Sequence, residues 1–96
     1  MNLKITNGAK RVLSRNIEFS NNVYNALEDI EVVLDQTFFK GNVILEEGCE
    51  KLCLNLNPKK WMNDSCVFDL FEQINYIIKC NLELNLPLKL NGKIFR

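Results

Sequence analysis

The stretch from Asp64 to Cys80 (DSCVFDLFEQINYIIKC) constrains the fold more than any other part of the chain. Its apolar residues recur at the i, i+3, i+4, i+7 spacing of an amphipathic helix with one broad buried stripe. They are Val67, Leu70, Phe71, Ile74, Ile77 and Ile78. Asn63, Asp64 and Ser65 supply capping oxygens at the start of this helix. We expect the remaining elements to cover the stripe.

The segments before this helix predict a strand hairpin and a second helix. Residues 2–6 alternate between apolar and polar, and Asn7-Gly8 favours a type I′ turn into a return strand over residues 9–14. The alternative is a short helix over residues 9–15 followed by a strand over 16–19. The cluster Ser20-Asn21-Asn22 then predicts the cap of an amphipathic helix that runs to about Gln36.

Two further hairpins are predicted. Residues 42–46 and 50–57 form the arms of one, with Glu47-Gly48 at the bend, and Pro58 ends its second arm because proline lacks the N–H that a ladder needs. In the tail, a leucine at every second position from 82 to 90 predicts a strand, and Asn91-Gly92 turns it into residues 93–96. Pro87 within that strand indicates a sheet edge or a bulge.

Together these elements predict an α+β fold, in which an antiparallel sheet of β-hairpins carries two amphipathic helices on one face. The predicted order is ββαββαββ. The chain has 96 residues, of which 47% are hydrophobic. That size and apolar content predict a single domain over residues 1–96.

The composition also limits where the protein acts. No apolar run approaches the roughly 18 residues of a membrane-spanning helix. The N-terminal segment MNLKITNGAK has no apolar region typical of a secretory signal. We therefore expect a cytoplasmic protein with no membrane partner. Its 12 basic and 12 acidic residues cancel, so net charge does not favour nucleic acid.

No residue pattern in the chain predicts a catalytic or metal centre. Histidine is absent, which removes the commonest general base and every site that needs a histidine ligand. Cys49 and Cys53 lie within a predicted hairpin, whereas Cys66 and Cys80 lie ~21 Å apart along one helix. These spacings do not suit a zinc site. We expect no cofactor and no enzymatic activity, with the four cysteines reduced and acting as small buried hydrophobes.

Acidic residues gather in one block of the chain. From Ile17 to Gln36 there are five acids and no Lys or Arg, a pattern that can bind a basic protein surface. The spacing of Glu28, Glu31 and Asp35 places them in one stripe on the polar face of the predicted helix; the same stripe is also what an ordinary solvated face contains. The candidate partner-binding residues are Glu28, Asp29, Glu31, Asp35, Glu46 and Glu47.

Basic residues gather near the two termini. They would form one patch if the terminal hairpins were neighbours, although protection of edge strands by Lys and Arg explains them equally well. The candidate patch comprises Lys4, Lys10, Arg11, Arg15, Lys89 and Lys93. The only rings that we expect to be exposed are Tyr24 and Trp61, and neither lies in a basic segment. Nucleic acid is therefore the less favoured partner.

A small non-catalytic protein-binding module fits these observations best. We expect an immunity-type or antitoxin-type protein of bacterial or phage origin that neutralises a toxin, such as a nuclease, by covering its basic cleft. A phage-encoded inhibitor protein and a small nucleic-acid-binding protein that uses the basic terminal segments are the alternatives. An edge strand of the sheet could also pair two copies of the chain into a homodimer.

Overall fold

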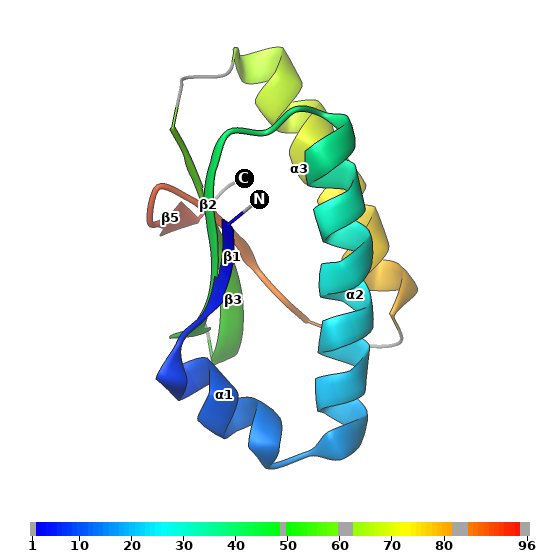
Figure 1. Ribbon diagram of the computed structural model, residues 1–96, viewed down its shortest axis with the longest axis vertical. Coiled ribbons are helices and arrows are strands. Elements are labelled where there is room, and N and C mark those ends of the chain that lie inside the picture. The colour runs from blue at the N-terminus through cyan, green and yellow to red at the C-terminus, as the bar shows by residue number, and fades with distance from the viewer. Residues whose placement is uncertain (1, 49, 60–62, 82–84, 95–96) are drawn as a thin grey trace.

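The structure is a computed structural model that describes residues 2–48, 50–59, 63–81 and 85–94 (Figure 1). Within these residues the order of elements is βααββαββ. They are β1 (Asn2–Ile5), α1 (Asn7–Ser14), α2 (Ile17–Gln36), β2 (Gly41–Gly48), β3 (Lys51–Pro58), α3 (Asp64–Cys80), β4 (Leu88–Leu90) and β5 (Lys93–Ile94). The predicted α+β class is confirmed, and α2 and α3 cover one face of the sheet (Figure 1).

The helix predicted over Asp64–Cys80 is α3, with the predicted bounds. Asn63 is its N-cap, and the Asn63 side chain accepts a hydrogen bond from the Cys66 N–H at 2.8 Å. This bond satisfies one of the backbone donors that have no partner within the first helical turn. The predicted apolar stripe is buried at Val67, Leu70, Phe71, Ile74 and Ile78, and Ile77 is partly buried against the same core.

The second predicted helix, α2, begins earlier than the capping cluster predicted. Asn16 is its N-cap and accepts a hydrogen bond from the Phe19 N–H at 3.0 Å. Ser20-Asn21-Asn22 therefore lies inside the helix, and the prediction that it caps α2 was wrong. The apolar stripe continues upstream of the cluster to Phe19, which packs against the core. That contact favours the earlier start.

The predicted N-terminal hairpin was wrong, because residues 7–14 form the helix α1. The Thr6 hydroxyl caps this helix by accepting a hydrogen bond from the Ala9 N–H at 3.1 Å. Ala9, Val12 and Leu13 are buried, and their i, i+3, i+4 spacing is helical. A return strand would have placed Val12 and Leu13 on opposite faces of the sheet. The alternative of a short helix at this position is confirmed, but the strand proposed to follow it over 16–19 is not.

The second hairpin is confirmed as the antiparallel pair β2–β3. Its register places Val43 opposite Leu56 and Leu45 opposite Leu54, and all four side chains are buried. β2 continues to Gly48, so Glu47 and Gly48 belong to the strand, and the prediction that they form the bend was wrong. β3 ends at Pro58, as predicted.

The sheet is mixed, whereas a wholly antiparallel sheet was predicted. Within the described residues its strand order is β1-β2-β3-β4-β5. The pairs β1–β2 and β3–β4 are parallel, and the pairs β2–β3 and β4–β5 are antiparallel. Each parallel pair is joined through helices, α1 and α2 in one case and α3 in the other. A helical connection returns the chain to the end at which the first strand began, so the next strand runs parallel to it.

The C-terminal strand is shorter than predicted. β4 covers only Leu88–Leu90, and residues 82–84 of the predicted strand lie outside the described residues. Pro87 comes just before β4, and its carbonyl accepts a hydrogen bond from the Leu54 N–H at 2.9 Å. Asn91 and Gly92 have φ values of 51° and 83°, which confirms the predicted turn into β5.

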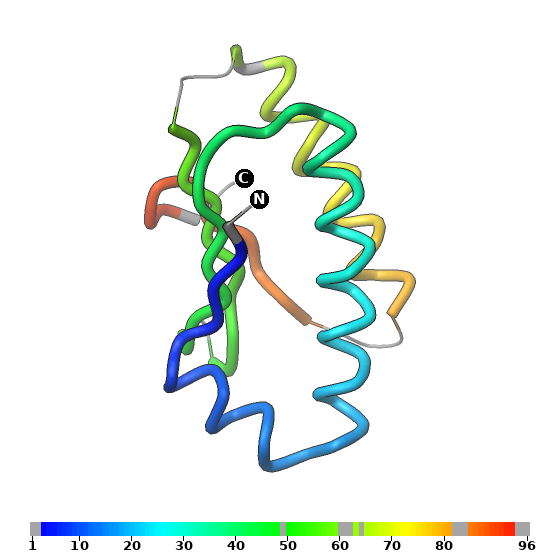
Figure 2. The backbone as a smooth tube through the Cα atoms, in the orientation of Figure 1, coloured from blue at the N-terminus to red at the C-terminus, as the bar shows by residue number. Residues whose placement is uncertain are grey.

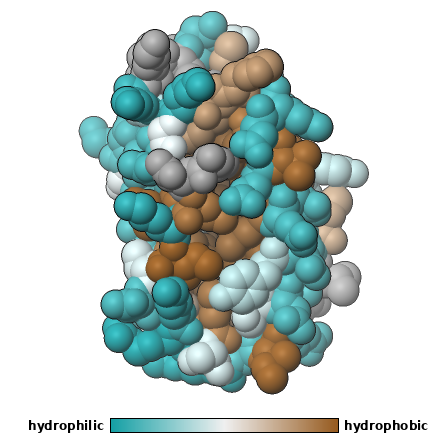
Figure 3. Space-filling model, in the orientation of Figure 1, coloured by the Kyte–Doolittle hydropathy of each residue, from teal (hydrophilic) through white to brown (hydrophobic). Residues whose placement is uncertain are grey.

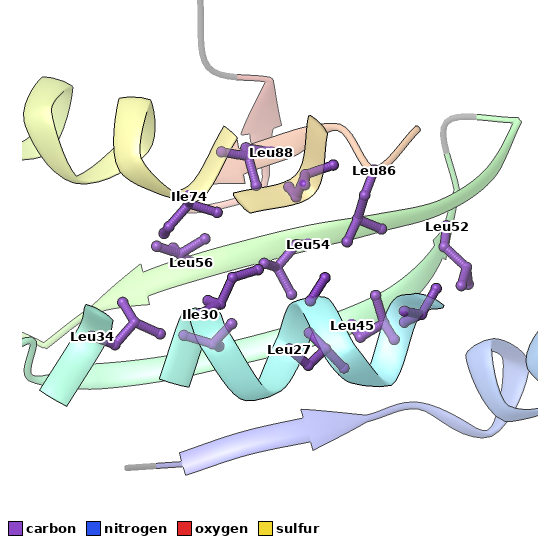
Figure 4. Close-up of a cluster of buried hydrophobic side chains, with 14 of the residues drawn as sticks. Leu27, Ile30, Leu34, Leu45, Leu52, Leu54, Leu56, Ile74, Leu86 and Leu88 are labelled. Atoms are coloured by element: carbon purple, nitrogen blue, oxygen red, sulfur yellow. The ribbon is translucent and has the colours of Figure 1, made fainter. Parts of the chain in front are cut away.

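The hydrophobic core lies between the sheet and the two long helices. Figure 4 shows side chains of α2 and α3 meeting those of β2, β3 and β4, with Ile30, Leu54 and Ile74 near the centre. The backbone trace in Figure 2 follows the same layers, with α1 between the lower ends of β1 and α2. The core thereby fixes α2 against the sheet.

Ile74→Ala should be among the most destabilising substitutions in the chain. Ile74 is fully buried at the centre of α3, and truncating such a side chain costs ~2–5 kcal/mol through lost burial and the cavity left behind. Urea denaturation measures the loss, with Tyr76→Ala as the control because Tyr76 lies on the same helix and is 71% exposed. A loss at Ile74 no larger than that at Tyr76 would contradict the assigned core.

Gly41→Ala should destabilise the protein far more than Gly92→Ala. Both glycines have positive φ, at 148° and 83°, and a residue with a Cβ held in such a region costs ~1–3 kcal/mol. At Gly41 the added Cβ would also clash with the Asn57 carbonyl oxygen, whereas at Gly92 it meets nothing within 4 Å. Thermal denaturation of the two variants provides the comparison. Equal melting temperatures would contradict this account of the entry into β2.

Candidate protein-binding surface

Three acidic residues lie along one flank of α2. Glu28, Glu31 and Asp35 follow one another at the spacing that places side chains on the same side of a helix. We call these three residues the acidic flank. Glu28 and Asp35 are exposed, and Glu31 is partly exposed. Within the described part of the chain, no Lys or Arg forms an ion pair with them.

The acidic flank faces away from α3. Between α2 and α3 lies a surface cavity of about 330 Å³, lined by Val33 of α2 and by Tyr76 and Ile77 of α3. Successive helical residues are rotated by ~100°, so Glu31 projects ~200° from Val33, on the other side of α2. In Figure 1, α3 lies behind α2 and β1 lies in front of β2 and β3. The acidic flank is therefore on the side of α2 that is nearest to the β1 edge of the sheet.

Asp29 is separated from the acidic flank. It follows Glu28 directly and therefore projects ~100° from it, toward the α3 side of α2. Asp29 is exposed. Of the four acids predicted on this helix, three share one surface and Asp29 does not.

Two exposed apolar side chains extend the acidic flank toward the start of α2. Ile17 is 79% exposed and Tyr24 is 48% exposed. Their spacing from each other and from Glu28 keeps them on the same side of the helix. Together with Lys10 and Leu13 of α1 they line a cavity of about 250 Å³. An exposed tyrosine beside a polar rim is typical of protein–protein interfaces.

The sequence predicted only part of this surface. Tyr24 was expected to be exposed, but Ile17 was missed because the helix was predicted to begin after Asn22. Recognising Asn16 as the N-cap would have placed Ile17 on the helix. Trp61, the other ring expected at the surface, lies outside the described residues. The expectation that other rings are covered was wrong, since Phe38, Phe68 and Tyr76 are also exposed.

The two predicted glutamates of β2 lie on opposite faces of the sheet. Glu46 faces away from the helices, and its Oε1 lies 3.8 Å from the Nζ of Lys89 on β4. Glu47 lies on the helix side, where a Cβ added at Gly8 would come within 3.2 Å of the Glu47 Oε2. A carboxylate there complements the positive end of the α1 dipole. Neither glutamate belongs to the acidic flank.

The basic residues predicted as a patch are distributed over the molecule. β1 and β5 are at opposite edges of the sheet, so Lys4 and Lys93 are not on neighbouring strands. Lys10 and Arg11 lie on α1, and Arg15 is its C-cap. Lys89 pairs with Glu46. The structure therefore does not bring the two terminal groups of basic residues together through their strands.

A larger cavity, of about 740 Å³, lies between α1 and the end of the β2–β3 hairpin. Two basic residues, Arg15 and Lys51, and two acidic residues, Glu47 and Glu50, are among those that line it. The Nζ of Lys51 is 3.9 Å from the centre of the Phe19 ring, so a cation–π contact occupies it. With its charges balanced, this cavity favours neither an anion nor a cation.

The cysteines differ in exposure. Cys53 is buried as predicted, whereas Cys66 and Cys80 are exposed free cysteines, so the prediction that they are buried was wrong. Residue 49 lies outside the described residues. Among the residues that the structure does describe, no group of His, Cys, Asp or Glu is arranged to hold a metal ion. None of the described helices combines the length and the hydrophobicity that a membrane span requires.

No protein-family model, no curated protein and no solved structure matches the chain.

Cys66 and Cys80 should react with a thiol reagent in the native protein, and Cys53 should react only after unfolding. The difference follows from exposure, because Cys53 has no accessible surface. Alkylation of the native protein followed by peptide mass spectrometry identifies the modified positions. Modification of Cys53 as fast as that of Cys66 would contradict the assigned burial of the β3 side chain.

Proposed function

We propose that this chain is a non-catalytic protein-binding module that binds a basic surface of a partner protein through the acidic flank of α2. The observation that carries the proposal is the position of Glu28, Glu31 and Asp35. They form a continuous negative surface that the core does not need and that no ion pair within the described residues neutralises. Ile17 and Tyr24 add apolar area beside it.

The acidic flank is held in place before a partner arrives. On the opposite side of α2, Ala26, Leu27 and Ile30 are buried in the core, so the helix does not have to be ordered on binding. Preorganisation lowers the entropic cost of association. A fixed row of carboxylates also raises the association rate with a basic partner, and the gain is lost as salt screens the charges.

The form of this function that we propose is inhibition by occlusion, as in immunity proteins and antitoxins. A nuclease toxin has a basic cleft that binds phosphates, and an acidic helix face can occupy such a cleft. A phage-encoded inhibitor of a basic host protein would use the same surface. The distribution of Lys and Arg over α1 and opposite edges of the sheet does not favour the alternative of nucleic-acid binding.

Reversing the charges of the acidic flank should abolish partner binding and leave the fold intact. The variant Glu28→Lys, Glu31→Lys, Asp35→Lys places like charges against a basic partner. The matched control, Asp29→Lys, Asp69→Lys, Glu72→Lys, changes the net charge equally at exposed sites outside the acidic flank. Partners are captured from the cells that make the protein, and binding is compared for the three forms at low and high salt.

The proposal expects the control variant to retain the partner and the acidic-flank variant to lose it by about tenfold or more. For a toxin partner, co-expression of the wild-type chain should restore growth, and co-expression of the acidic-flank variant should not. Equal capture by all three forms would contradict the proposal. Salt-sensitive binding of the wild-type chain to generic DNA or RNA, strengthened by the charge reversal, would favour the nucleic-acid alternative.

A further inference from the structure

The free edge of β1 has backbone groups available for another strand. β1 pairs with β2 on one side, and no described strand lies on its other side. The Thr6 N–H donates to the Leu45 carbonyl at 3.0 Å. Because backbone groups alternate in direction along a strand, those of Lys4 also point to β2, whereas those of Leu3 and Ile5 point to the free edge.

The free edge of β1 adjoins an apolar surface and the acidic flank. Leu3 and Ile5 are partly buried against the core on the helix side of the sheet. Figure 3, which has the orientation of Figure 1, shows apolar surface between the β1 edge and α2, bordered by hydrophilic side chains. A strand added to β1 would run beside this surface, and its inward side chains would lie on the side of α2 that carries Glu31, the acid of the flank closest to the buried face of the helix.

We propose that β1 is a strand-addition site, and that its occupant is an extended segment of the partner protein that carries Lys or Arg at alternate positions. The inference rests on the proposed function and names how the partner is held. Backbone hydrogen bonds to Leu3 and Ile5 would supply affinity, as in other cases of β-strand addition. Contacts to the acidic flank would supply specificity.

The occupant carries Lys or Arg at alternate positions because the two faces of β1 have different surroundings. Inward side chains of Lys or Arg have apolar stems that can cover the surface beside Leu3 and Ile5, with the charged ends reaching the carboxylates of α2. On the outer face of the sheet, the side chain of Lys4 of β1 is exposed. A second positive charge there would be repelled, so outward positions of the occupant should be neutral or acidic.

A second copy of the chain fits this edge poorly. Two copies that paired antiparallel through β1 would form one continuous sheet with all helices on the same face. The two acidic flanks would then face each other across the new interface, with Glu28, Glu31 and Asp35 of each copy opposing those of the other. Like charges in that arrangement repel, and this repulsion acts against the homodimer.

The test uses a synthetic peptide, Lys-Thr-Lys-Thr-Lys with blocked ends, and the control peptide Glu-Thr-Glu-Thr-Glu. Amide hydrogen exchange of the full chain is followed by NMR with and without each peptide. The lysine peptide should slow exchange at the Leu3 and Ile5 amides by about tenfold or more, and the glutamate peptide should not. Added salt should weaken the effect, because the charge contacts are exposed.

The outcomes separate this inference from the proposed function. Binding of the lysine peptide that shifts α2 resonances but leaves Leu3 and Ile5 unprotected would overturn strand addition and leave the acidic flank as the binding surface. Protection that persists in the acidic-flank variant would uphold strand addition and contradict the role of the flank. No binding up to about 1 mM peptide would overturn the inference. Concentration-dependent protection without peptide would do the same, because the occupant would then be a second copy.

Discussion

The antiparallel pairing of β2 with β3 is the interaction on which the rest of the structure depends. Their inward side chains, including Leu45 and Leu54, are fully buried under α2 and α3, and burying each leucine contributes ~1.5–3 kcal/mol. β1 and β4 then add to the two outer edges of this hairpin in parallel orientation. The hairpin and the helices α1 and α2 therefore determine which edge of β1 has no neighbouring strand among the described residues.

Local patterns predicted the elements whose signals are long or chemically specific. The apolar stripe and Asn63 located α3, and Asn91-Gly92 located the last turn. The same type of signal failed at Asn7-Gly8, because a turn dipeptide competes with the Thr6 cap and with the helical spacing of Ala9, Val12 and Leu13. The parallel pairings could not be predicted, since a four-residue strand alternates identically in either direction and its partner is chosen by contacts distant in sequence.

For the candidate surface, the sequence predicted which acids group together but not where they lie relative to the sheet. Helical spacing alone grouped Glu28, Glu31 and Asp35, because their separation does not depend on where α2 begins. Their position beside β1 depends on the packing of α3 against the Val33 side of α2. This packing is a tertiary contact, so it could not be predicted from the sequence of α2 or α3 alone. Glu46 and Glu47 looked equivalent along the chain, yet the alternation of β2 places one on each face of the sheet.

The central claim is that a basic partner contacts the side of α2 that faces β1. Zero-length carbodiimide cross-linking of the captured complex, read by mass spectrometry, tests it directly because the reagent joins a lysine amine only to a carboxylate in contact with it. The account predicts cross-links from partner lysines to Glu28, Glu31 or Asp35. Cross-links confined to Asp69 and Glu72 of α3, with none on the acidic flank, would contradict it.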